Sequence, residues 1–268
     1  MPEASNPIGL FDSGVGGLTV AHALGSLLPD EQLCYYGDTA HLPYGDKSRE
    51  TIIRYSTGIA DFLMDKGCKV ILIACNSASA NAFLEVKEHV GDRAVVLNVV
   101  DPIVEHVTTL SDVKNIGVIG TKATIESRSY QVALGQRTPN LLVSALATPL
   151  FVPMIEEGFV FDDISNAIIR SYLSRQELNG IDSLILGCTH YPIIRNQISR
   201  FYNFEVSVLD SARIVAEYVR NYLGENNLLA SKRNGENSFF VSDHTPSFEI
   251  IANMFFNEKI RLEKHSIW

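Results

Sequence analysis

Short runs of apolar, often β-branched residues alternate along this chain with segments in which apolar positions recur at helical spacing. Apolar runs that lack an alternating polar position are typical of strands buried on both faces of a parallel sheet. The pattern predicts nine strands, at residues 8–11, 32–36, 70–74, 94–100, 115–119, 141–145, 183–186, 206–209 and 238–241. Because helical segments separate these strands, the chain is expected to have an α/β fold.

The helical segments show their buried faces as apolar stripes. One stripe has Ser48 before it as a candidate N-cap and consists of Ile52, Tyr55, Ile59, Phe62 and Leu63. A second stripe consists of Ile164, Ala167, Ile168 and Tyr172. A further helix is predicted over residues 18–28, directly after a glycine-rich turn.

The chain contains an internal repeat, visible as three pairs of similar segments in the same order. The segment at Ile8 resembles the one at Ile116, an offset of 108 residues, and the run ending in Cys75 resembles the run ending in Cys188, an offset of 113. The segment around Asp101 resembles the one around Asp210, an offset of 109. The simplest interpretation is two pseudo-symmetric α/β halves with mainly parallel sheets.

This repeat predicts where a ligand binds. In open α/β sheets, ligands lie beyond the carboxyl ends of the strands, and Cys75 and Cys188 each follow such an end. A pseudo-twofold axis would bring these ends face to face. We therefore expect the two cysteines to oppose each other across a cleft between the halves.

Composition and charge exclude several classes of protein. With 46% hydrophobic and 20% charged residues in 268, the chain is expected to be globular. A net charge of −9 without a basic run argues against nucleic-acid binding. No apolar stretch approaches the roughly 20 residues that span a bilayer, and the N-terminal residues lack the features of a signal peptide. The sequence thus favours a cytoplasmic protein whose four cysteines are free thiols.

The glycine-rich turn from Asp12 to Gly17 offers free backbone N–H groups to an anion. A dinucleotide fingerprint would need glycine where Thr19 stands, and the Gly-Lys-Ser/Thr of a P-loop is absent. The alternative is an ordinary turn with Asp12 or Ser13 as the helix N-cap. An acidic side chain at the mouth would suit a ligand that has an ammonium group beside a carboxylate. A second loop, with Asp38 and Pro43-Tyr44-Gly45, follows the next strand and is expected at the same rim.

Cys75-Asn76-Ser77 and Cys188-Thr189-His190 follow matched strands of the two halves. A thiol at a helix N-terminus is expected to have a lowered pKa. Buried structural thiols are the alternative for this pair, and that interpretation is accepted for Cys34 and Cys68. A zinc site is a weaker alternative, since paired Cys-x2-Cys spacing is missing. An acid/base pair, one thiolate and one thiol on opposite faces of a carbon, would perform racemisation.

Taken together, the motifs resemble those of bacterial glutamate racemases, within the cofactor-independent aspartate/glutamate racemase superfamily. The motifs, in order, are Asp12-Ser13-Gly14-Val15-Gly16-Gly17-Leu18-Thr19-Val20, Gly37-Asp38-Thr39 with Pro43-Tyr44-Gly45, Ala74-Cys75-Asn76-Ser77-Ala78, residues 117–124, and Gly187-Cys188-Thr189-His190-Tyr191-Pro192. They extend from about residue 8 to about residue 220. Position 77 departs from the pattern, being Ser where many members have Thr, but the hydroxyl is kept.

The resemblance implies interconversion of L- and D-glutamate without a cofactor or metal, to supply D-glutamate for peptidoglycan. It implies that Cys75 takes the α-proton of D-glutamate and Cys188 that of L-glutamate, assisted by Asp12 and His190 respectively. An acidic residue after the Phe-Val-Pro segment is either Glu156 or Glu157, and Glu156 is taken as the catalytic candidate. The implied substrate-binding residues are Asp12, Ser13, Tyr44, Gly45, Asn76, Ser77, Thr121, Thr189 and His190.

The repeats and the resemblance together predict one domain from residues 1–99 plus 211–268 and a second from residues 100–210. The resemblance also implies a homodimer. Two alternatives stay open: an aspartate racemase or related amino-acid racemase, and an amino-acid-binding module without catalysis.

Overall fold

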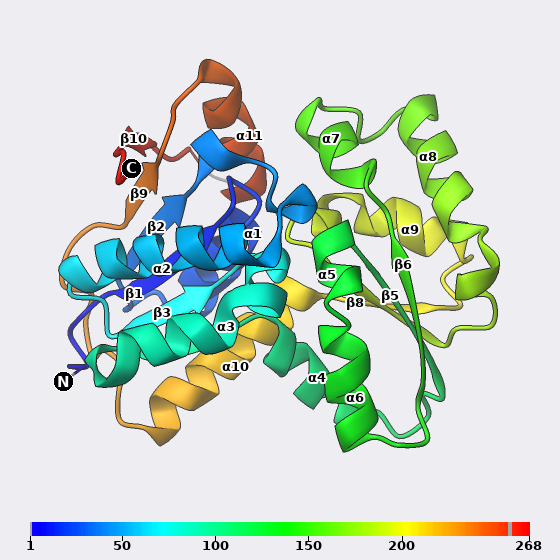
Figure 1. Cartoon of the computed structure of the whole chain (residues 1–268), viewed down its shortest axis with the longest axis horizontal. Coiled ribbons are helices and arrows are strands. Elements are labelled where there is room, and N and C mark those ends of the chain that lie inside the picture. The colour runs from blue at the N-terminus through cyan, green and yellow to red at the C-terminus, as the bar shows by residue number, and fades with distance from the viewer. Residues whose placement is uncertain (1, 257–258) are drawn as a thin grey trace.

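The computed structural model describes residues 2–256 and 259–268 and divides the strands between two sheets (Figure 1). The first sheet has the order β10-β9-β2-β1-β3-β4, and the second has the order β6-β5-β7-β8. Every strand pair in both sheets is parallel. The first sheet comprises β1 (Ile8–Asp12), β2 (Leu33–Gly37), β3 (Val70–Ile73), β4 (Val95–Asn98), β9 (Ser238–Val241) and β10 (Glu263–Lys264). The second comprises β5 (Asn115–Gly120), β6 (Leu142–Ala147), β7 (Ser183–Gly187) and β8 (Ser207–Leu209).

The two sheets confirm the predicted repeat. The order β2-β1-β3-β4 is reproduced as β6-β5-β7-β8, so that each strand of the second sheet has a counterpart earlier in the chain. All nine predicted strands are present. Strands β1, β2, β3 and β7 are buried along their whole length, which accounts for their apolar runs, whereas β6 is only partly buried. The two-residue strand β10 was not predicted, because Glu263 and Lys264 are exposed and polar.

Helices connect the strands and cover the sheets (Figure 1). They are α1 (Leu18–Leu27), α2 (Arg49–Asp65), α3 (Asn76–Val90), α4 (Val100–Thr108), α5 (Lys122–Glu126), α6 (Ser129–Arg137), α7 (Phe151–Glu156), α8 (Asp163–Leu173), α9 (Arg195–Phe201), α10 (Ser211–Glu225) and α11 (Pro246–Phe256). Ser48 caps α2 as predicted, since its side chain accepts a hydrogen bond from the Thr51 amide. None of the helices in the described ranges is long and apolar enough to cross a membrane.

The chain passes between the sheets twice. It leaves the first sheet after β4, builds β5 to β8, and returns through α10, which packs on α1. Strand β9 then adds to β2, and the C-terminal elements, orange to red in Figure 1, lie on the first half. One buried apolar cluster is continuous from Leu10 and Leu72 of the first sheet to Ile119 and Leu186 of the second. The domain limits at 99/100 and 210/211 stay a prediction.

Two local predictions are wrong. The strand predicted over residues 94–100 ends at Asn98, because the Asn98 side-chain oxygen accepts the amides of Val100 and Asp101 and starts α4 there. The predicted stripe of α8 is partly misplaced: Tyr172 is buried as predicted, but Ile164 is 54% exposed and Ala167 is exposed, and Ile169, outside the predicted stripe, is buried. The orientation of α8 is set by the Tyr172 ring, which packs edge-on against Phe151.

Candidate active site

Cys75 and Cys188 line one cavity between the two halves. The cavity has a volume of about 20 Å³ and is lined by Ser13, Leu42, Pro43, Tyr44, Gly45, Cys75, Asn76, Ser77, Thr121, Val152, Cys188, Thr189 and His190. This volume is close to what a single water molecule requires. The two halves must therefore separate before a ligand as large as an amino acid can enter.

Cys75 is placed by the first sheet. Strand β3 ends at Ile73, and Cys75 is the N-cap residue of α3, with its carbonyl accepting the Ser79 amide. Its thiol Sγ lies 3.8 Å from the Ser13 hydroxyl, which comes from the turn after β1. The adjacent strands β1 and β3 thus bring the glycine-rich turn and the first cysteine to one wall of the cavity.

The expectation of a lowered pKa at Cys75 is wrong. Burial, together with the negative charge of Asp12, raises the pKa of the Cys75 thiol to about 12, although hydrogen bonds from Ala78 and Ser13 act in the opposite direction. The free-energy cost of removing the thiolate from water exceeds the stabilisation that the helix N-terminus gives it. Cys75 is therefore a thiol at neutral pH in the closed protein.

Cys188 follows β7 and has a basic partner. Its Sγ lies 3.7 Å from Nδ1 of His190, and Nε2 of His190 lies 2.9 Å from Glu156 Oε1. Burial alone would lower the pKa of His190, but the hydrogen bonds with Cys188 and Glu156 raise it to about 10. His190 is therefore an imidazolium at neutral pH. A cation in this position is the partner that a thiolate at Cys188 requires.

Asp12 lies behind the cavity wall, not at its mouth. It is fully buried, its Oδ1 accepts the Gly14 amide at 2.9 Å, and its Oδ2 accepts the Thr189 hydroxyl at 3.2 Å. Burial raises the pKa of Asp12, while His190 and the hydrogen bonds counteract that shift. The N-cap of α1 is Gly17, so the alternative in which Asp12 or Ser13 caps this helix is wrong. Asp12 instead connects the turn of the first half to Thr189 of the second.

Two glycines permit the close approach of the halves. A side chain at Gly16 would collide with the ring of His190, and a Cβ at Gly45 would lie 2.7 Å from Cβ of Thr121. Hydrogen bonds also cross the cleft: Ser77 to Thr121 at 2.8 Å, and Asn76 to the Tyr130 hydroxyl at 2.8 Å. The substrate-binding candidates thus include both cavity walls and the contacts that hold them together.

The structure brings every predicted site residue to this region, but not all of them line the cavity. All of them line the cavity except Asp12 and Glu156. Glu156, in α7, reaches the site through His190 and faces a neighbouring cavity of about 210 Å³ that Glu157 also lines. Of the two acidic candidates, Glu156 is the one hydrogen-bonded to His190. Cys34 and Cys68 lie in the apolar core, away from the cavity lining.

Several functional positions were missed from the sequence. Leu42 and Val152 complete the cavity lining, Tyr130 holds Asn76, and the Phe255 ring of α11 packs edge-on against His190 at 5.1 Å. Leu42 could have been identified from its position next to Pro43-Tyr44-Gly45, which was a predicted part of the site. Nothing in the local sequence of the other three indicates their contact, because their partners are distant in the chain.

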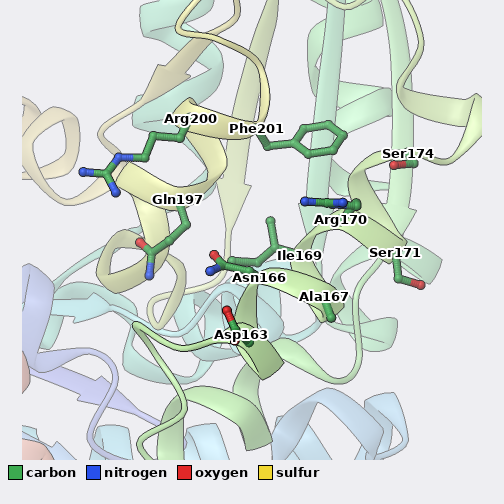
Figure 2. Close-up of a pocket in the computed structure, with 10 residues that line it drawn as sticks. All are labelled: Asp163, Asn166, Ala167, Ile169, Arg170, Ser171, Ser174, Gln197, Arg200 and Phe201. Carbon is green, nitrogen blue, oxygen red and sulfur yellow. The ribbon is translucent and has the colours of Figure 1, made fainter.

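A larger hollow, of about 770 Å³, lies between α8 and α9 (Figure 2), and neither Cys75 nor Cys188 lines it. Its lining residues include one carboxylate, Asp163, and no Cys or His, and the guanidinium of Arg200 points away from that of Arg170 in Figure 2. Size alone therefore does not identify the functional cavity. In the part of the chain that the structure describes, no group of three or more His, Cys, Asp or Glu side chains is arranged to hold a metal ion.

Comparison with known proteins gives consistent relatives. Residues 18–219 match the model of the family described as Asp/Glu/Hydantoin racemase. The glutamate racemase of Geobacter metallireducens is 40% identical over 257 residues, covering 94% of this chain and 93% of the relative. The crystal structure of glutamate racemase from Francisella tularensis in complex with D-glutamate has a TM-score of 0.91 at 39% identity, covering 98% of both chains. Glutamate racemase isoform RacE1 from Bacillus anthracis has a TM-score of 0.93 at 31% identity, with the same coverage.

Proposed function

Because the chain belongs to the Asp/Glu/hydantoin racemase family, we propose that it is a glutamate racemase working through two cysteine thiols. The observation that supports this most is the cavity itself. Two thiols from equivalent positions of the repeat line it, and each has a different ionisable neighbour. Two proton carriers on opposite sides of a substrate can remove a proton from one face of a carbon and return one to the other.

In the L-to-D direction, Cys188 is the base. Its thiolate, paired with the His190 imidazolium, takes the α-proton of L-glutamate, and the C–H bonding electrons remain on the substrate as a carbanion. The Cys75 thiol then donates its proton to the opposite face, giving D-glutamate, a Cys188 thiol and a Cys75 thiolate. In the D-to-L direction the roles exchange. The high pKa of Cys75 makes its thiolate a strong base, and Glu156 assists the other side through His190.

Neutral donors would bind the two carboxylates of the substrate. Among the described residues that line the cavity none is Lys or Arg, whereas Ser13, Asn76, Ser77, Thr121 and Thr189 offer hydroxyl or amide hydrogens. Donors fixed in a water-poor site stabilise charge that develops in the transition state without reorganising. This matters because the substrate α-carboxylate is already anionic when the proton is removed.

Closure of the cleft belongs to the same proposal. The hydrogen bonds between Ser77 and Thr121 and between Thr189 and Asp12 hold the two halves together. Breaking them would open the site for binding and release, and re-forming them would exclude water during proton transfer. The proposed cofactor-independent reaction uses only glutamate, one cysteine thiolate and one cysteine thiol.

The wider role is proposed from the resemblance of the motifs to those of glutamate racemases. We propose that the enzyme supplies D-glutamate for peptidoglycan, in the cytoplasm, as a homodimer without membrane or nucleic-acid partners. The net charge of −9 supports the last point. Light scattering of the purified protein tests the dimer, and a monomer at micromolar concentration would contradict it.

The decisive experiment is α-proton exchange. Metal-free protein is incubated with L-glutamate in D2O, and α-deuteration and optical rotation are followed together. Loss of rotation with α-deuteration of both enantiomers is expected, and Cys34→Ala serves as a control thiol substitution outside the cavity. Exchange with aspartate but not glutamate would reassign the substrate, while binding without any exchange would indicate an amino-acid-binding module.

A further inference from the structure

Trp268, the one tryptophan of the chain, lies against the first-half wall of the site. Its ring meets those of Tyr55 and His41 edge-on, at centroid distances of 5.1 and 5.4 Å. His41 stacks on Tyr55 at 4.2 Å, and Tyr55 stacks on Tyr44 at 5.8 Å. These four rings, here called the aromatic stack, connect Trp268 to a residue that lines the cavity.

Asp38 provides a second connection between the same residues. Its carboxylate is fully buried and accepts the Tyr44 hydroxyl at 2.6 Å, the Ser242 hydroxyl at 2.8 Å and the Trp268 indole N–H at 3.4 Å. Its Oδ1 also lies 2.8 Å from Nδ1 of His41. A carboxylate buried this deeply requires several donors, and the loss of one leaves its remaining lone pairs poorly satisfied.

Tyr44 transmits these contacts to the cavity. It is 1% exposed and lines the cavity with its neighbours Pro43 and Gly45, and Gly45 lies directly against Thr121 of the second half. The same segment therefore forms part of the wall and one of the closest approaches across the cleft. Displacing Tyr44 by even a small distance would change both the shape of the wall and the fit of the two halves.

The C-terminal strand holds Trp268 in place. β10 pairs with β9, the His265 amide donates to the Val241 carbonyl, and the Tyr36 hydroxyl donates to the His265 carbonyl. The indole lies over α2, since a Cβ at Gly58 would be 2.7 Å from its ring. Trp268 is nevertheless 47% exposed, so burial of apolar area does not fully account for its placement.

We propose that Trp268 is a positioning residue for racemisation, which holds the Tyr44 segment in its substrate-binding position through Asp38 and the aromatic stack. This inference rests on the proposed function. Trp268 does not touch the substrate or either thiol, so its substitution should alter binding and closure more than the proton transfers themselves.

Kinetics separate positioning from simple structural support. Trp268→Ala should raise KM for both enantiomers about three- to tenfold, the range expected for one ordinary hydrogen bond, because the 3.4 Å contact with Asp38 is long, while kcat changes much less. Trp268→Phe keeps a ring in the stack and loses the indole N–H, so its KM should lie between those of the wild-type protein and Trp268→Ala. Phe161→Ala, at an aromatic residue that is 77% exposed on the second half, is the matched control and should leave KM unchanged.

Tryptophan emission gives a readout that a purely structural role would not move. In Cys75→Ala protein, net racemisation should be strongly slowed, so L-glutamate can be titrated as a ligand. The titration should shift or quench the emission of Trp268 with saturation. Unchanged KM in both Trp268 variants of an active, folded enzyme, or emission that is indifferent to substrate, would overturn the inference. Wild-type protein that exchanges no α-proton would instead overturn the proposed function, and the emission titration would still test the link between Trp268 and the cavity.

Discussion

The two walls of the cleft share a strand order and differ in electrostatics. Cys75 and Cys188 follow equivalent strands, β3 and β7, in sheets of the same strand order. Cys75 has Ser13 and the carboxylate of Asp12 as neighbours, and its pKa is raised to about 12. Cys188 has His190, a cation at neutral pH. The repeat thus supplies two matched positions for thiols, and the surrounding side chains give each thiol a neighbour of different charge.

The largest effect is expected from removing either thiol. Cys75→Ala and Cys188→Ala should each lower racemisation by about 10²–10⁴-fold, because one of the two proton carriers is lost. The comparison predicts more: Cys75→Ala should still exchange the α-proton of L-glutamate with D2O without inversion, and Cys188→Ala should do so only with D-glutamate. Proton NMR of each enantiomer in D2O measures this. Exchange of the same enantiomer in both variants would contradict the assignment of the two faces.

The next largest effect concerns the partner of Cys188. Glu156→Gln removes a carboxylate hydrogen-bonded to His190, and kcat/KM should fall by about 10- to 100-fold, the range for a hydrogen bond to a charged group. The fall must be equal in both directions, since enantiomers interconvert with an equilibrium constant of one. The effect on the Cys188 side alone should appear in the primary deuterium isotope effect on racemisation. This isotope effect should rise with α-deuterated L-glutamate and fall with α-deuterated D-glutamate. Glu157→Gln, at the exposed neighbouring residue, is the matched control.

A smaller effect is expected in the dependence of stability on pH. The pKa of His190 is about 10 in the folded protein and about 6.5 in an unfolded chain. Its interactions therefore stabilise the fold fully below about pH 6.5, and this contribution is lost as the pH rises through about 10. Glu156→Gln should cost about 1–2 kcal/mol of unfolding free energy at pH 6 and much less at pH 10.5. Urea unfolding at both pH values measures the difference, and a cost independent of pH would exclude the ion pair as its source.

The smallest effect tests the contacts that join the walls. Thr121 is the repeat counterpart of Ser13, and its hydroxyl lies 2.8 Å from that of Ser77. Thr121→Ala should raise KM about three- to tenfold and cost about 1 kcal/mol of stability, as expected for one hydrogen bond. Thr121→Ser retains the hydroxyl and should restore both quantities. If the serine variant were as impaired as the alanine variant, the methyl contact with Gly45 would be responsible instead.

Much of the architecture could be predicted from the sequence, because the evidence for it is local. Strands buried on both faces leave uninterrupted apolar runs, and a duplicated half leaves matched motifs at a nearly constant offset. The cap at Ser48 is local for the same reason. Side-chain orientation is not local: the face of α8 depends on where Tyr172 meets Phe151.

The site was harder to predict where burial outweighs a local rule. The helix N-terminus at Cys75 favours the thiolate, but desolvation raises the pKa of Cys75 instead. The acidic residue of the turn, Asp12, was expected at the mouth and is turned inward to Thr189. Contacts from the C-terminal segment, such as Phe255 on His190, depend on how the chain returns to the first half. No short motif encodes that return.

The double crossing of the chain between its halves also limits how the enzyme can move. Two domains joined by one chain segment can rotate relative to each other about several axes. Two domains joined by two neighbouring segments rotate mainly about the axis that passes through both connections. Opening along that one coordinate would uncover Cys75 and Cys188 together. Under the proposed mechanism, a single closing motion would then bring both thiols to the α-carbon of the substrate, one to each face.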